Sequence, residues 1–97
     1  MNAYELLYFV DPAATEEMRA GAMKRIEVAI TTNGGTIDSV EDWGKRKLAF
    51  EVDKLNEGDY TLINFHANPE DIAELDRVLR INDAVKRHMV VRRPDEN

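Results

Sequence analysis

The sequence contains no cysteine among its 97 residues. This absence excludes a disulfide framework, thiolate zinc sites, iron–sulfur clusters held by cysteine and a cysteine nucleophile. Serine and histidine are almost as scarce, because only Ser39, His66 and His88 occur. A hydrolytic triad or a histidine metal site therefore has few possible members, and we expect neither a cofactor nor a bound metal.

Long apolar runs are also missing. The longest is Leu6 to Val10, much shorter than the roughly 18 residues of a membrane-spanning helix, and residues 1–4 carry no base that would begin a secretory signal. The composition, with 43% hydrophobic and 33% charged residues, is typical of a globular protein. We therefore expect a single domain over residues 1–97, located in the cytoplasm and not at a membrane.

Basic residues are outnumbered, with 13 lysines and arginines against 19 acids and a net charge of −6. An acidic chain binds nucleic acid poorly on its own, because lysine and arginine provide most of the attraction to phosphate. The bases are unevenly spread, however, and residues 77–93 hold six bases against one acid. The candidate RNA contacts are Lys45, Arg46, Lys47, Arg80, Lys86, Arg87 and Arg92. The alternative for these residues is a merely solvated face.

Six segments show the periodicity of regular secondary structure. In chain order they are a strand at 4–10, a helix at 15–33, strands at 36–52 and 60–67, a helix at 69–82 and a strand at 84–92. Thr15 and Asn68 are suited to cap the two helices, and acids follow each of them. Gly44 after Trp43 predicts a bend in the long strand, and residues 56–59 predict a hairpin turn.

This order of elements predicts a ferredoxin-like βαββαβ sandwich of the α+β class. We expect a four-stranded antiparallel sheet with both helices on one face, because right-handed crossovers leave few other topologies. The first and third strands would then lie in the middle of the sheet. His66 and His88 would lie on strands separated by the first strand, too far apart to share a metal ion or a proton relay.

The uncovered face of such a sheet is the first indication of function. A half-solvated antiparallel strand alternates apolar with polar residues, but the two central strands are apolar on both sides. We therefore expect this face to bind a partner, the alternative being scattered apolar surface without a role. The candidate partner-binding residues are Leu7, Phe9, Trp43, Phe50, Ile63 and Phe65.

A free-standing enzyme or small-molecule-binding domain of the acylphosphatase kind is the alternative function for this outline. In that family the turn after the first strand cradles a phosphate and supplies an arginine. Here residues 11–14 contain an acid and a proline and no glycine-rich run, so the turn would repel an anion. We expect no catalytic residue, and the chain is predicted not to be an enzyme.

Residues 41–50 read EDWGKRKLAF, which combines a glycine, consecutive bases and Leu-Ala-Phe. The segment resembles the hallmark of the bacterial small-subunit ribosomal protein six family, which has a glycine, basic residues and then Leu-Ala-Tyr. The matching residues are Gly44, Arg46, Leu48 and Ala49, and further matches occur at Tyr4, Glu5 and residues 79–85. Phe50 departs from the usual tyrosine, and Glu51 stands where proline is frequent.

The resemblance implies a non-catalytic, ferredoxin-like protein of the small ribosomal subunit. It also implies pairing with a basic partner, the eighteenth protein of that subunit, and binding of the heterodimer to the central domain of the small-subunit rRNA. We therefore expect a ribosome-associated protein with this rRNA and this basic protein as partners. A basic partner would supply the positive charge that the chain lacks.

Overall fold

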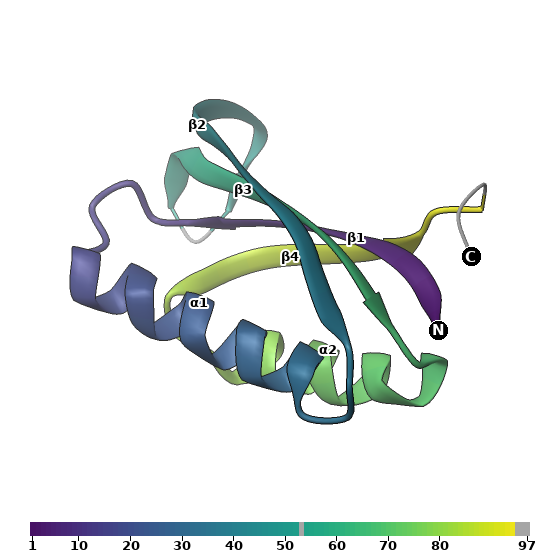
Figure 1. Cartoon of the computed structure of the whole chain (residues 1–97). Helices are drawn as coiled ribbons and strands as arrows, with labels where there is room; N and C mark the ends of the chain where they lie inside the picture. The colour runs from purple at the N-terminus through teal and green to yellow at the C-terminus, as the bar shows by residue number, and fades with distance from the viewer. Residues whose placement is uncertain (53, 95–97) are drawn as a thin grey trace.

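The computed structural model describes residues 1–52 and 54–94. Its elements are β1 (Asn2–Val10), α1 (Glu16–Thr31), β2 (Thr36–Val52), β3 (Leu55–Ala67), the short 3₁₀ helix η1 (Pro69–Asp71), α2 (Ile72–Ile81) and β4 (Val85–Arg92). The strands pair in the order β2-β3-β1-β4, so β1 and β3 are central. Both helices lie on one face of the sheet (Figure 1), which confirms the predicted ferredoxin-like fold.

Helix α1 begins where the sequence predicts. The Thr15 hydroxyl accepts a hydrogen bond from the Met18 N–H at 3.1 Å and so caps the helix. Glu16 and Glu17 follow in the first turn, where the helix dipole favours negative charge. The other predicted cap is wrong in detail, since Asn68 precedes η1 and its side chain makes no capping hydrogen bond.

The bend predicted at Gly44 is present. Its φ is 73°, in the left-handed region that favours glycine, and the β2–β3 register shifts between Asp42 and Gly44. The Asp42 carboxylate accepts the Gly44 N–H at 3.0 Å, which satisfies the backbone donor at this irregularity. Beyond the bend, β2 turns away from the helices, as Figure 1 shows.

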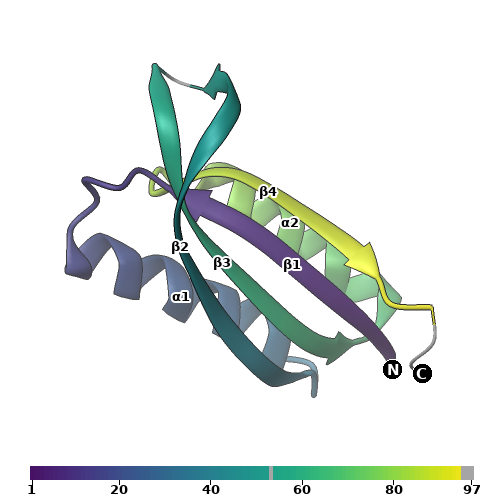
Figure 2. The same ribbon diagram turned by 90° about the horizontal axis from the view of Figure 1, so that it is seen from above.

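The hairpin turn predicted at residues 56–59 is wrong. Val52 pairs with Leu55, so the strands continue past Gly58 as a two-stranded hairpin arm, made of residues 45–52 and 54–59 (Figure 2). Gly58 serves packing instead of turning, because a Cβ there would lie 2.5 Å from Cδ1 of Phe9. A glycine kept for close approach has the same sequence signature as a turn glycine.

The core lies between the sheet and the helices. Alternate residues of a strand point to opposite faces, and most of those of β1 and β3 that face the helices are almost fully buried. They pack against one side of each helix, and the largest fully buried side chains are Leu6, Ile26, Ile30, Ile63, Phe65, Leu75 and Leu79. Burial also raises the pKa of Tyr8, which keeps its phenol neutral. Neither helix in the described part of the chain is long and apolar enough to cross a membrane.

We predict that Gly35→Ala destabilises the fold by about 2 kcal/mol or more, a cost at the scale of core overpacking. An added Cβ would lie 2.2 Å from the Ile30 carbonyl oxygen and 2.7 Å from that of His66, and neither backbone can move freely. Gly21→Ala is the matched control, because nothing lies within 4 Å of a Cβ at that exposed helical position. That variant should gain about 0.5–1 kcal/mol of helix propensity. Urea unfolding measures both, and equal stabilities would contradict the packing argument.

Candidate functional site

The face of the sheet opposite the helices carries an open-face patch, made of Leu7, Trp43, Leu62, Met89 and Val91. These side chains, with Glu5, line a shallow hollow on all four strands. Met89 is 56% exposed and Val91 41% exposed, although both are large and apolar. A contiguous exposed apolar surface of this kind is typical of a binding site.

For two of the predicted partner-binding residues, Ile63 and Phe65, the prediction of an exposed position is wrong. Both are 0% exposed, because β3 pairs Ile63 with Leu6 and Phe65 with Tyr4 on the side that faces the helices. They belong to the core and offer no surface to a partner. The neighbouring residue in β3, Leu62, is the one that reaches the open face.

The other predicted partner-binding residues are divided between two places. Leu7 and Trp43 lie in the open-face patch. Phe9 points to the same side but is only 5% exposed, because its ring packs against Gly58 and against Tyr60, whose ring centroid is 5.1 Å away. Phe50 lies on the hairpin arm, beyond the last residue of β1, and is 83% exposed.

Carboxylates accompany the open-face patch. Glu5 lines the hollow itself. The Trp43 indole N–H donates to the Glu41 carboxylate at 3.4 Å, which holds a second negative charge at the edge of the patch. The Arg46 guanidinium lies over the indole, 5.6 Å from the ring centroid, and donates to the Trp43 carbonyl at 3.2 Å. The surface is therefore apolar and flanked by acids, with one base above the indole.

Apart from Arg92, whose guanidinium donates to Asn2 Oδ1, the bases of the chain fall into two groups, according to whether they make an ion pair. The paired bases are Arg19 with Asp59, Lys24 with Glu27, Arg77 with Glu74, Arg80 with Asp76 and Arg93 with Asp38. Within residues 1–52 and 54–94, the bases without an ion pair are Arg25, Lys45, Arg46, Lys47, Lys54, Lys86 and Arg87. Sequence reasoning singled out five of these seven and missed Arg25 and Lys54.

The pairing register brings most of the unpaired bases to one end of the sheet. Lys45 pairs with Asp59, Asp59 with Val10, and Val10 with Val85, so one row joins the hairpin arm to the start of β4. We call this the basic end; its bases are Lys45, Arg46, Lys47, Lys54, Lys86 and Arg87.

Two of the predicted RNA contacts, Arg80 and Arg92, do not belong to the basic end. Arg80 lies near the end of α2, but its guanidinium donates to the Asp76 carboxylate at 2.8 Å. Arg92 pairs with Tyr4 at the opposite end of the sheet, about 17 Å from Arg87 along β4 by strand rise, and donates to Asn2 Oδ1 at 3.3 Å. Strand length therefore separates residues that are close in the sequence.

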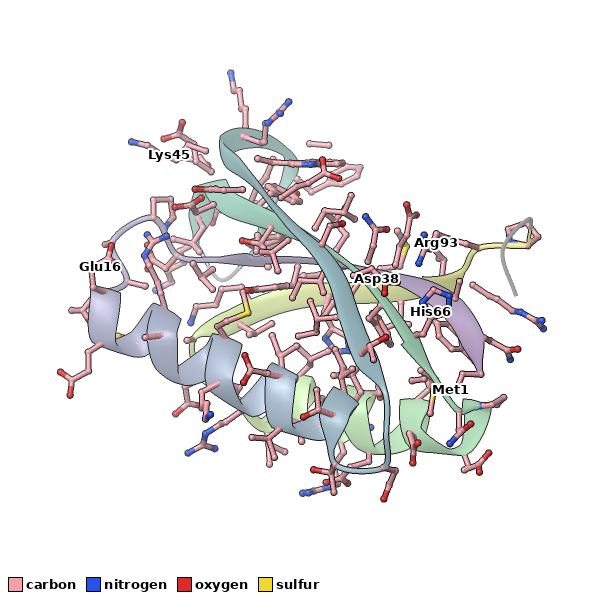
Figure 3. The ribbon with its side chains drawn as sticks, in the orientation of Figure 1. Met1, Glu16, Asp38, Lys45, His66 and Arg93 are labelled. Carbon is pink, nitrogen blue, oxygen red and sulfur yellow. The ribbon has the colours of Figure 1, made fainter. Side chains whose placement is uncertain are left out.

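Each histidine bonds an aspartate, which the sequence did not indicate. His66 Nδ1 lies 2.6 Å from Asp38, a carboxylate that Arg93 also approaches at 3.3 Å (Figure 3). His88 Nε2 lies 2.6 Å from Asp76. The two histidines are on β3 and β4 with β1 between them, as predicted, and no group of metal-binding side chains occurs in the part of the chain that the structure describes.

The turn after β1 is not suited to bind an anion. The Asp11 carboxylate accepts the Ala13 N–H at 2.8 Å, so this backbone donor already has an acceptor and a negative charge lies at the turn. Arg19 stabilises the turn instead of facing a ligand. It donates to the carbonyls of Pro12 at 2.9 Å and Ala14 at 3.0 Å and pairs with Asp59 on β3. This geometry opposes the acylphosphatase alternative.

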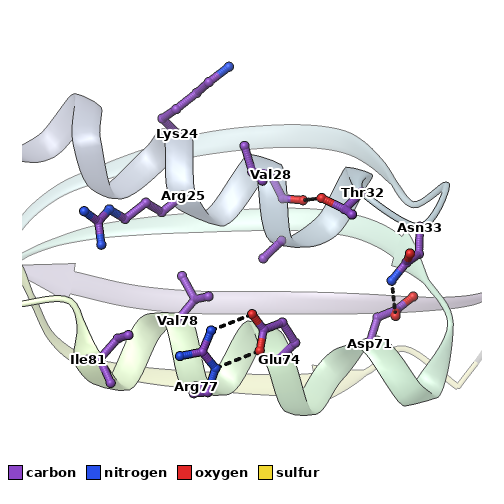
Figure 4. A pocket seen from close by; sticks show the side chains of 11 residues that line it. Lys24, Arg25, Val28, Thr32, Asn33, Asp71, Glu74, Arg77, Val78 and Ile81 are labelled. Carbon is purple, nitrogen blue, oxygen red and sulfur yellow. Dashed lines mark hydrogen bonds and ion pairs between the residues drawn. The ribbon is translucent and has the colours of Figure 1, made fainter.

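A second hollow lies between the two helices, on the far side of the molecule (Figure 4). Val28, Val78 and Ile81 supply its apolar surface. Arg77 makes two hydrogen bonds of 2.7 Å to Glu74, which lower the pKa of the Glu74 carboxyl. The two opposite charges therefore neutralise each other. The hollow contains none of the predicted RNA or partner residues.

The Asp76–His88 contact predicts a specific loss of stability in acid. The hydrogen bond from His88, and to a lesser extent the charge of Arg80, hold the pKa of Asp76 below its ordinary value. The resulting stabilisation is present above the unfolded-state pKa of about 3.9 and is lost as the pH falls through the lower folded-state value. It is at most about 1 kcal/mol, because Asp76 is 44% exposed and solvent screens the pair.

We expect Asp76→Asn to be less stable than the wild type at pH 7 and equally stable near pH 2, by urea unfolding at several pH values. Asp83→Asn is the control, because Asp83 is exposed and makes no ion pair within the described residues; its stability should follow that of the wild type at every pH. A constant deficit of Asp76→Asn across this range would show that its ionisation plays no part.

Comparisons with known proteins match nearly the whole chain and agree with the family that residues 41–50 resemble. The family model described as ribosomal protein S6 matches residues 3–92. Small ribosomal subunit protein bS6 of Clostridium novyi is 48% identical over 91 residues, which are 94% of this chain and 96% of that protein. Its counterpart in Clostridium beijerinckii is 46% identical over 91 residues, with the same coverage of both chains.

Solved structures agree with this result. The crystal structure of 30S ribosomal protein S6 from Thermotoga maritima has a TM-score of 0.86 at 36% identity and covers 97% of this chain and 89% of that chain. The C-terminal domain of the MgtC protein from Mycobacterium tuberculosis, with a TM-score of 0.63 at 9% identity, covers 100% of this chain and 93% of that one and shares the fold alone. The S6 relatives are ribosomal proteins and not enzymes, which confirms the prediction of a non-catalytic protein. The chain thus belongs to the ribosomal protein S6 family of the small ribosomal subunit.

Proposed function

We propose that this chain is a structural, rRNA-binding protein of the cytoplasmic ribosome that binds the central domain of the small-subunit rRNA together with a basic partner. The partner is the eighteenth protein of the small subunit, as the family resemblance implies. The observation that carries the proposal is the segregation of charge. Of the seven bases named above as having no ion pair in the described part of the chain, all but Arg25 lie at the basic end.

The unpaired state of these bases supports phosphate contact. A lysine that already neutralises a carboxylate gains little from a phosphate, because the first ion pair must break. Lys45 and Lys47 have no such partner among the described residues and are exposed on the hairpin arm. Arg80 and Arg92 remain in the proposed RNA-binding set, with the requirement that Arg80 leaves Asp76 when it binds.

The open-face patch supports a separate contact with the protein partner. Its apolar side chains would gain from burial, at about 25 cal/mol for each Å² removed from water. Glu5 and Glu41 beside it favour a basic partner and disfavour RNA, whose phosphates they would repel. The proposal therefore assigns the hairpin arm and the start of β4 to RNA, and the middle of the open face to protein.

We predict that the double substitution Lys45→Gln and Lys47→Gln flattens the salt dependence of RNA binding. The slope of log K against log salt should decrease by about one unit for each lysine–phosphate ion pair that the substitutions remove. The measurement is a titration of the heterodimer onto its rRNA fragment at several salt concentrations.

Lys24→Gln combined with Arg25→Gln is the control for this experiment. It makes the same change in net charge on the exposed side of α1, and it should leave the slope close to that of the wild type. Equal slopes for both double variants would mean that the bases of the hairpin arm act only through net charge. The wild-type chain without its partner should bind the fragment weakly, because its net charge is −6.

We predict that Met89→Gln weakens binding to the basic partner about tenfold in the absence of RNA, because it places a polar amide in the open-face patch. Calorimetric titration of one protein into the other measures the affinity. Val28→Gln is the matched control, since Val28 is 48% exposed but lies on α1 in the hollow between the helices. Similar losses for both variants would contradict the assignment of the partner to the open face.

A further inference from the structure

Phe50 is a large aromatic residue with almost no cover. Its 83% exposure exceeds that of every other exposed large apolar residue of the described chain, and the next values are 59% for Ile81 and 56% for Met89. Leaving a phenylalanine in water forgoes about 1.5–3 kcal/mol of burial. The described residues leave this ring uncovered, which points to a contact outside the chain.

The position of Phe50 separates it from the open-face patch. β1 pairs with β3 only as far as the row that joins Val10 to Asp59, and Phe50 lies beyond that row on the two-stranded hairpin arm. Figure 2 shows the arm continuing past the end of β1. A partner seated on the middle of the sheet would not need this residue.

The hairpin arm around Phe50 carries lysines without an ion pair among the described residues, together with the exposed acids Glu51 and Glu57. Lys47 is three residues away, about 10 Å along an extended strand, and Lys54 follows the turn of the arm. Lys45 projects outward from the same arm, as Figure 3 shows. None of the three has an ion pair within the residues that the structure describes.

An exposed ring among unpaired lysines has the chemistry of a single-strand nucleic-acid contact. A base stacks on the ring, while the lysines meet the phosphates on either side of it. The combination of a stacking surface with lysines that have no ion pair in the described chain thus favours RNA as the occupant of this site, in contrast to the sequence-based assignment of Phe50 to the partner surface.

We propose that Phe50 stacks against an unpaired nucleobase of the small-subunit rRNA, with the lysines of the hairpin arm on the flanking phosphates. This inference rests on the proposed function, because it names one contact within the proposed RNA site. It explains why the arm carries an aromatic side chain at a position where the described residues do not bury it.

The test compares Phe50→Ala, Phe50→Leu and Phe50→Tyr in the heterodimer bound to its rRNA fragment. Removal of the stacking ring should weaken binding about 5- to 100-fold for the alanine and leucine variants. Tyrosine keeps the ring and should remain within about twofold of the wild type. The salt slope should not change in any of them, since no charge is removed. Because Phe50 is exposed, thermal unfolding should be unaltered, which separates a missing stacking interaction from a damaged fold.

Three outcomes would overturn the inference. Wild-type RNA affinity in Phe50→Ala would exclude stacking, and the proposed function would still stand if Lys45→Gln with Lys47→Gln flattens the salt slope. Weaker binding of Phe50→Ala to the basic protein without RNA would assign Phe50 to the protein interface. Failure of the wild-type heterodimer to bind the fragment at all would overturn the proposed function, and this inference with it.

Discussion

The antiparallel pairing of β1 with β3 is the constraint on which the rest of the structure depends. Nine residues of β1 pair in one register, from Asn2 with Ala67 to Val10 with Asp59. Because side chains alternate along a strand, a slip of one residue would exchange the two faces of both central strands. The register therefore decides which apolar side chains form the core under the helices and which remain on the open face. Ile63 and Leu62 are adjacent in sequence and have opposite roles for this reason.

Two glycines allow the sheet to carry two separate surfaces, the open-face patch and the hairpin arm. Gly44 takes a left-handed backbone that bends β2, and Gly58 leaves the space that the Phe9 ring occupies. Together they allow β2 and β3 to leave the sheet as an arm without exposing the end of β1. The arm carries four bases, with Glu51 and Glu57 among them, while Glu5 and Glu41 stay beside the open-face patch. An acidic chain can thus present a group of bases without ion pairs to described residues and an apolar, acid-flanked surface at different places.

The sequence by itself determined the fold class and the order of elements. Helical periodicity, capping residues and apolar strands are local signals, and the observed bounds of β2 agree with the predicted range of 36–52. The bend at Gly44 and the concentration of bases in two segments were also readable, because each depends on residues that are neighbours in the chain. The same locality explains why the family resemblance of residues 41–50 is visible without a structure.

Only the tertiary structure decided which charges are free and which apolar residues are exposed. Arg80 and Arg87 look alike in the sequence, yet Asp76 neutralises one and no described acid pairs with the other. Phe50 and Phe65 are both strand phenylalanines, but one is 83% exposed and the other fully buried. These outcomes depend on pairing between strands and on contacts between residues far apart in the chain. Periodicity can show that a strand has two faces, but it does not show which face the helices cover or where the partner strand ends.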